Sequence, residues 1–276
     1  MALIRRLCCI LLTVVAMTTI TSVVNAQTAK AKVSTLSIGK ADGVGIWIHP
    51  TDKSKSLVIG ADHSKGLGTF DLKGALIEVV NFGKGGAGEV DVRYNFPLNG
   101  RKISIVVSAN NKQNTLRIFT VDPQTCLLEE ITGKHAALGI NAYGSCLYHS
   151  VLTGKFYSFV TSREGLIEQW ELFDNGQGKV DAVRVRQINI MDGAVDPKAD
   201  HKIEACVGDD ELGWVYISQE RECQIWRYGA EPGQGSKRIL VDMAMIDPED
   251  NVEGLALYRV GKTDGYLVIS IQNSWK

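Results

Sequence analysis

The feature of this chain that most constrains its fold is a group of four short β-rich segments that recurs along the sequence. The segments are rich in apolar and β-branched residues, and turn residues such as Lys73-Gly74 separate them. No helical periodicity of roughly ten or more residues interrupts the pattern, so the sequence predicts an all-β fold. The four groups are Ile46–Ile48, Ser56–Gly60, Leu67–Leu72 and Ala75–Val80; Val90–Phe96, Ile103–Ser108, Thr115–Val121 and Leu127–Ile131; Gly144–His149, Phe156–Thr161, Leu166–Leu172 and Ala182–Ile190; and Ile203–Val207, Trp214–Ser218, Gln224–Tyr228 and Arg238–Met243.

The interval between the groups favours a β-propeller over a β-sandwich. The groups repeat roughly every 44 to 60 residues, as the blades of a β-propeller do. A sandwich of about eighteen strands would be unusually large. Aromatic residues recur on the third segment of each group, where neighbouring blades would pack face to face, and we expect them in the core. They are Phe70, Phe119, Trp170 and Trp226.

The repeat is incomplete at its C-terminal end. A fifth group begins with Val252–Tyr258 and Tyr266–Ile271, so the sequence predicts about four and a half four-stranded blades. Propellers bury their strand edges by closing into a ring. The segment Val33–Ile38 is expected to add one strand, which is less than a blade. We therefore expect that the sequence is a fragment or that the protein docks on another structure.

The N-terminal residues have the pattern of a secretory signal peptide. Arg5 and Arg6 precede an apolar run from Leu7 to Val24, and Val24-Asn25-Ala26 is a small-residue cleavage site. A membrane anchor is the alternative, because the run is near the lower length for a span. The threonines and serine in the run, together with the cleavage site, favour a signal peptide that is removed over a membrane anchor. We predict a signal peptide at 1–26, an N-terminal strand segment at 27–41 and an incomplete propeller at 42–276, in a secreted or periplasmic protein that has no membrane attachment after cleavage.

Charge and cysteine content limit the possible partners. The chain has 30 Lys and Arg against 31 Asp and Glu, and this balance argues against a nucleic-acid partner or an anionic membrane surface. Export permits disulfides, and the cysteine spacing matches no metal motif. Cys146 and Cys206 lie within apolar strand patterns, so we expect packed free thiols there.

A series of short motifs carries a family likeness. In chain order they are Ile46-Trp47-Ile48-His49-Pro50, Val90-Asp91-Val92-Arg93-Tyr94-Asn95-Phe96-Pro97-Leu98, Tyr143-Gly144-Ser145-Cys146-Leu147-Tyr148-His149-Ser150, Arg163-Glu164-Gly165, Glu168-Gln169-Trp170, Gly208-Asp209-Asp210-Glu211, Ile225-Trp226-Arg227-Tyr228, Ala230-Glu231-Pro232 and Val252-Glu253-Gly254-Leu255. Together they resemble the β-propeller phytases, the calcium-dependent alkaline phytases of bacteria, over nearly all of residues 42–275. The resemblance implies a six-bladed propeller of which the last blade and a half is absent.

The chemistry that the resemblance implies is phosphomonoester hydrolysis of phytate and other inositol phosphates. Phytate is a polyanion that repels an incoming hydroxide. Calcium ions neutralise phosphoryl oxygens and lower the pKa of a bound water, which then attacks in line. Calcium prefers about six to eight oxygen ligands, mainly carboxylates and carbonyls. Glutamates on successive blades around a channel would supply them.

The resemblance also implies a set of calcium ligands. Glu220 and Tyr143 would help to hold the attacking water and are the implied catalytic residues. Asn251 stands where the family usually has an aspartate, so it keeps an oxygen but loses a charge. The Val90 carbonyl corresponds to a ligand of a structural calcium. The full implied set is Tyr143, Glu204, Glu220, Asn251, Glu253, Gln272, Asp42 and Val90.

Several positions depart from the family pattern. An Asp-Asp-Pro-Ala run commonly precedes Ile-Trp, and here the run is Asp42-Gly43-Val44-Gly45, so one carboxylate of a calcium site is missing. Arg163 stands where a lysine usually contacts substrate phosphate, which keeps the charge and adds bidentate reach.

The other departures remove cations. Two phosphate-contacting lysines become His63 and Ser64, with Lys65 one position on. An expected arginine becomes Asn111, with Lys112 beside it. The implied phosphate contacts are Arg163, Lys65, Lys112 and His63.

Two functions follow as expectations. The first is an extracytoplasmic calcium-dependent phytase of the 3-phytase type, weakened by the lost cations. The second is an accessory domain that binds phosphate or calcium without turnover. The family that the chain resembles includes two-domain proteins in which an incomplete N-terminal propeller precedes a complete one. By this resemblance, we expect a following propeller domain as a partner that would complete the ring.

Overall fold

A computed structural model describes residues 32–36, 38–134, 136–192, 201–243 and 250–273. The predicted signal peptide lies outside these residues. Contacts divide the chain into residues 1–32 and 33–276, and the strands of the described residues lie in the second unit. Within the described residues, no helix has the length and apolar character that a membrane span requires.

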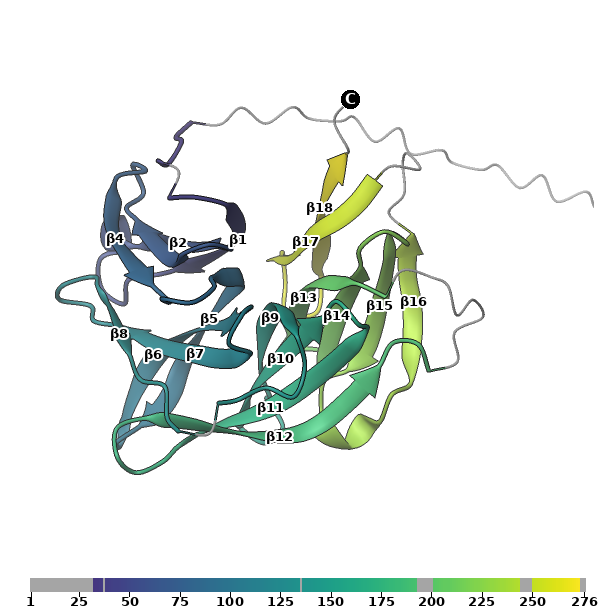
Figure 1. Cartoon of the computed structure of the whole chain (residues 1–276). Helices are drawn as coiled ribbons and strands as arrows, with labels where there is room; N and C mark the ends of the chain where they lie inside the picture. The colour runs from purple at the N-terminus through teal and green to yellow at the C-terminus, as the bar shows by residue number, and fades with distance from the viewer. Residues whose placement is uncertain (1–31, 37, 135, 193–200, 244–249, 274–276) are drawn as a thin grey trace, which may run out of the picture. The chain divides into compact units, whose positions relative to one another are not determined.

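The described residues form four antiparallel four-stranded sheets and one antiparallel pair, which follow one another as the blades of a propeller (Figure 1). The predicted all-β propeller is therefore confirmed, with four blades and half of a fifth. Blade 1 has β1 (Ala41–Trp47), β2 (Leu57–Asp62), β3 (Gly66–Phe70) and β4 (Leu76–Asn81); blade 2 has β5 (Ala87–Leu98), β6 (Arg101–Asn110), β7 (Thr115–Val121) and β8 (Leu128–Glu130); blade 3 has β9 (Ala142–His149), β10 (Phe156–Ser162), β11 (Leu166–Asp174) and β12 (Val180–Asn189); blade 4 has β13 (Ile203–Asp209), β14 (Trp214–Gln219), β15 (Gln224–Gly229) and β16 (Arg238–Met243); and the half-blade has β17 (Asp250–Arg259) and β18 (Gly265–Asn273).

Apolar clusters between consecutive blades hold the sheets together. Trp47 of blade 1 packs in one cluster with Val90 and Phe119 of blade 2. Similar clusters join blades 2 and 3, blades 3 and 4, and blade 4 with the half-blade. Of the aromatic residues expected in the core, Phe70, Phe119 and Trp170 are buried, and Trp226 packs at the edge of a cluster. Face-to-face packing of blades therefore explains the aromatic residues of the third strands in blades 2, 3 and 4.

The innermost strands of successive blades run side by side, from β1 to β5, β9, β13 and β17. Glycines allow this close approach. An ideal Cβ at Gly88 of β5 would lie 2.2 Å from the backbone oxygen of Tyr143 in β9, and one at Gly208 of β13 would lie 2.2 Å from that of Leu147. Since real Cβ atoms do not approach so closely, these positions accept only glycine without movement of the strands.

Arg93 ties three of the inner strands together. Its guanidinium donates to Asp91 of its own strand at 2.8 Å, to Asp210 after β13 at 2.9 Å and to the carbonyl of Leu147 in β9 at 2.8 Å. These charge-assisted contacts fix the three strands relative to one another.

Two expectations are corrected. Residues 33–36 and 38 are not in a strand. They lie against blade 1, because an ideal Cβ at Gly74 would lie 2.6 Å from the Ser34 oxygen and one at Gly68 would lie 2.6 Å from the Ile38 side chain. Cys146 and Cys206 are not free thiols but form a disulfide, with Cα atoms 5.6 Å apart. The reason is that β9 and β13 are neighbouring inner strands, which brings two strand cysteines of different blades together.

Candidate metal centre

Three glutamates of blade 4 and the half-blade converge at one end of the inner strands. Glu204 is in β13, Glu220 follows β14, and Glu253 is in β17. Carboxylate oxygens of the three residues lie within 4.8 Å of one another. The Val252 N–H donates to the Glu220 carbonyl at 3.1 Å, which holds β17 beside the turn after β14. The structure thus brings together three of the residues that the sequence predicted as calcium ligands.

The backbone of Glu204 is held by blade 3. Thr161 of β10 donates its hydroxyl to the Glu204 carbonyl at 3.2 Å and accepts the N–H of Gly144 at 2.9 Å. An ideal Cβ at Gly144 would lie 1.8 Å from the same carbonyl oxygen. The position of Glu204 therefore depends on a glycine in the neighbouring inner strand.

The negative charges at this centre repel one another. Burial raises the pKa of Glu204, and a hydrogen bond to Glu253 and the charge of Glu253 raise it further. Burial also raises the pKa of Tyr143, as do the charges of Glu204 and Glu220. The neighbouring carboxylates thus disfavour ionisation of Glu204 when no cation is bound.

A cation fits this donor set. The side chain of Glu204 is buried, at 4% exposed, and its Oε2 has no hydrogen-bond partner. Buried polar atoms nearly always have partners, and an unpartnered carboxylate oxygen beside two other carboxylates suits a hard cation that prefers oxygen. The residues present therefore fit the metal that the sequence motifs imply.

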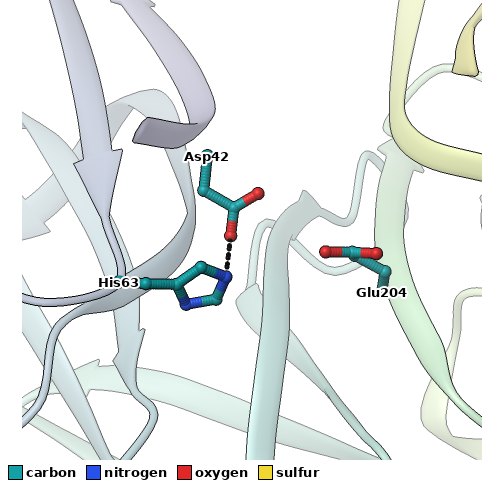
Figure 2. Close-up of side chains that lie close together, drawn as sticks. All are labelled: Asp42, His63 and Glu204. Atoms are coloured by element: carbon teal, nitrogen blue, oxygen red, sulfur yellow. Dashed lines mark ion pairs between the residues drawn. The ribbon is translucent and has the colours of Figure 1, made fainter. Parts of the chain in front are cut away.

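Asp42 and His63 form a second group with Glu204. His63 Nε2 lies 2.5 Å from Asp42 Oδ2, and the Glu204 carboxylate points toward this pair (Figure 2). His63 Nδ1 accepts from the Asn111 amide nitrogen at 3.0 Å, while the Asn111 oxygen accepts the N–H of Gly86 at 3.1 Å. Because Nδ1 is an acceptor, the proton of the neutral ring lies on Nε2 and faces Asp42. Both nitrogens of His63, predicted as a phosphate contact, are thus engaged.

The other predicted phosphate contacts are exposed. Arg163 lies over the ring of Tyr143, with Cζ 3.7 Å from the ring centroid. Lys65 and Lys112 lie on two turns that the Asn111–His63 contact joins. Lys202, which belongs to none of the sequence motifs, places Nζ 3.7 Å from Glu220 Oε1. Cations therefore border the carboxylates on the blade 3 and blade 4 sides.

The remaining predicted ligands lie on β5, β17 and β18. Asn251 and Gln272 are opposite each other in the β17–β18 register. Val90 is buried, and an ideal Cβ at Gly45 of β1 would lie 3.2 Å from its carbonyl oxygen. The Val90 carbonyl thus faces the strand that carries Asp42.

Sequence reasoning missed Glu89. Burial raises its pKa to about 8, and the charges of Asp42, Asp91 and Glu253 contribute. The signal in the sequence is its position, directly before Val90, the predicted carbonyl ligand. Glu89 lines a cavity of about 240 Å³ with Asp42 and Glu253.

Comparisons with known proteins agree on one family. A family profile described as Phytase matches residues 2–276. The chain is 38% identical over 240 residues to the 3-phytase of Bacillus subtilis (strain 168), and the match covers 85% of this chain and 60% of the relative. The chain thus spans three fifths of the length of this curated relative.

Solved structures resemble the chain more distantly. A crystal structure of a Lactobacillus plantarum protein is 11% identical with a TM-score of 0.49, covering 83% of this chain and 64% of that one. The crystal structure of BBS1N in complex with ARL6DN is 10% identical with a TM-score of 0.45, covering 84% and 61%.

Proposed function

The chain belongs to the phytase family, and we propose on that basis that it is a calcium-dependent phytase that acts outside the cytoplasm, in a secreted or periplasmic setting. Its substrates are phytate and related inositol phosphates, and the reaction releases inorganic phosphate from a phosphomonoester. The observation that carries the proposal is the carboxylate group of Glu204, Glu220 and Glu253, with a buried Glu204 oxygen that has no partner.

Calcium is the metal that this donor set favours. The oxygen donors are carboxylates, with Tyr143, Asn251, Gln272, Asp42 and the Val90 carbonyl as further candidates, and hard cations with flexible coordination prefer such sets. When bound, calcium would neutralise phosphoryl oxygens and acidify a coordinated water. Glu220 and Tyr143 would orient that water, since the Tyr143 hydroxyl and the Glu220 carboxylate both face Glu204.

Exposed cations around the centre would bind the substrate. Arg163 presents a guanidinium over Tyr143 and is the residue best placed to grip a phosphate from the blade 3 side. Lys65 and Lys112 would contact more distant phosphates of the same inositol ring. His63 would reach phosphate only by giving up its contact with Asp42.

An accessory role is the second candidate. The observation that favours it is the Asn111–His63–Asp42 chain of contacts. Asn111 and His63 stand where the family has cations, and here both side chains are engaged in contacts within the protein. A domain of this kind would bind calcium and inositol phosphates, with turnover supplied by a partner propeller domain.

The test is phosphate release from calcium phytate by the purified protein, beside its Glu220→Ala variant. We expect release by the native protein and its loss in the variant. Release that is absent, or equal in both proteins, contradicts the enzymatic proposal. In that case, calorimetric binding of inositol hexakisphosphate in the presence of calcium would support the accessory role.

A further inference from the structure

The carboxylate of Glu89 occupies the space next to Gly43, where a side chain would otherwise stand. An ideal Cβ at Gly43 would lie 1.9 Å from Glu89 Oε2, 2.5 Å from Glu89 Cδ and 2.9 Å from the Glu89 Cα. Atoms that are not bonded do not come so close, so a side chain at position 43 and the present position of this carboxylate exclude each other. The glycine in β1 is what lets a side chain from β5 lie against β1.

This space adjoins the candidate metal centre. Asp42 of β1, Glu89 of β5 and Glu253 of β17 line the same cavity, of about 240 Å³. The cavity is therefore bordered by carboxylates from three inner strands. It is large enough for a calcium ion with several waters, since a water occupies about 30 Å³ of liquid.

The backbone at Glu89 is held in place. Ser108 of β6 donates its hydroxyl to the Glu89 carbonyl at 2.7 Å. The next carbonyl, of Val90, faces β1 near Gly45. Consecutive residues of β5 thus direct a carboxylate and a carbonyl oxygen toward β1, beside the carboxylate of Asp42.

We propose that Glu89 is a calcium ligand, which supplies from β5 the carboxylate that position 43 of β1 lacks. This inference rests on the proposed function, because it assigns a residue to the same metal centre. The missing carboxylate at Gly43 left the expected calcium site short of one charge. In the structure, the Glu89 carboxylate of β5 lies in that space. Its charge matters because ligand charge is a main determinant of calcium affinity.

The first experiment is a calorimetric calcium titration of the full chain and of its Glu89→Gln variant. Glutamine keeps the shape and an oxygen but removes the charge. We expect the variant to lose a site, or to bind calcium there about tenfold or more weakly. Glu129→Gln is the matched control, because Glu129 is exposed on β8, and it should titrate like the native protein. Native affinity and stoichiometry in Glu89→Gln would overturn the inference.

The second experiment moves the carboxylate back to β1. Glu89→Asn alone should weaken calcium binding as Glu89→Gln does, and Gly43→Asp in the Glu89→Asn background should restore it. In the native background Gly43→Asp should weaken binding, since the two side chains compete for one space. Recovery of calcium binding in the double variant supports the inference, and native calcium affinity in Glu89→Asn overturns it.

The two proposals fail in different ways. If the native protein takes up no calcium, the metal centre itself is wrong. If the native protein binds calcium, Glu220→Gln loses it and Glu89→Gln does not, only the role of Glu89 is wrong.

Discussion

Gly144 in β9 lies directly against the backbone carbonyl of Glu204 in β13, with space for no side chain between them. We predict that Gly144→Ala forces the two inner strands apart and lowers the free energy of unfolding by about 1–3 kcal/mol, the usual cost of overpacking. Because Glu204 moves with its backbone, calcium affinity should fall as well. Chemical denaturation and calorimetry would measure the two effects.

Gly233→Ala is the control for this prediction. Gly233 has open space around its Cα and no left-handed backbone, so alanine should be tolerated there. Equal effects of the two substitutions would show that the contact with Glu204 is not the cause.

Arg163 carries the prediction about substrate binding. Arg163→Gln removes the charge, and a lost charge-assisted phosphate contact costs about 1.5–3 kcal/mol, or roughly ten- to hundredfold in binding. We therefore expect a rise in KM for calcium phytate with a smaller change in kcat. Arg163→Lys keeps the charge but loses the planar contact over Tyr143. Its KM should therefore lie between that of the native protein and that of Arg163→Gln. A fall in kcat at native KM would instead place Arg163 in the chemical step.

Stability without calcium should depend on pH. The ordinary pKa of a glutamate is 4.5, and burial with neighbouring carboxylates raises that of Glu89 to about 8 and raises that of Glu204 as well. The folded protein then holds protons that the unfolded chain releases, so stability falls as pH rises from about 5 toward 8 and above. We expect Tm in a chelator to decrease over this range.

Calcium should cancel this dependence, because a bound cation stabilises the ionised carboxylates that the proton otherwise neutralises. Thermal unfolding at pH 6 and at pH 8, each with chelator and with calcium, measures the effect. The calcium-induced rise in Tm should be larger at pH 8 than at pH 6. A rise that is larger at pH 6 would contradict the assignment of these two residues.

Most of the fold could be predicted from the sequence, because its signals are local. Turn residues and β-rich segments gave four complete blades and a half-blade close to their observed bounds. The strand expected at Val33–Ile38 is wrong, because residues 33–36 and 38 pair with no strand. The described residues there lie against the blade 1 turn at Gly74 instead, and no local pattern reveals that.

The centre was predictable only in part. Glu204, Glu220 and Glu253 converge as the motifs implied. Glu89 could not be identified, since an isolated glutamate on a strand is usually solvated. Its position before Val90 is a weak signal, and its contact with Gly43, 46 positions earlier, joins strands of different blades and leaves no pattern in either segment. The same holds for Cys146 and Cys206, each of which looks like an ordinary apolar strand residue.

The disulfide between Cys146 and Cys206 carries the last prediction. It joins β9, which contains Tyr143, to β13, which contains Glu204, and it closes a loop with a sequence separation of 60. A native disulfide of this loop size stabilises by about 2–4 kcal/mol. For a domain of this size, that corresponds to a Tm decrease of roughly 5–15 °C in Cys146→Ser/Cys206→Ser. Since the bond holds the two strands that carry Tyr143 and Glu204, calcium affinity should fall in the same variant. Cys126→Ser, which removes a thiol outside the disulfide, is the matched control and should change neither quantity. Equal Tm values for the double variant and the native protein under non-reducing conditions would contradict the predicted stabilisation, and equal calcium affinities would show that the bond does not constrain the metal centre.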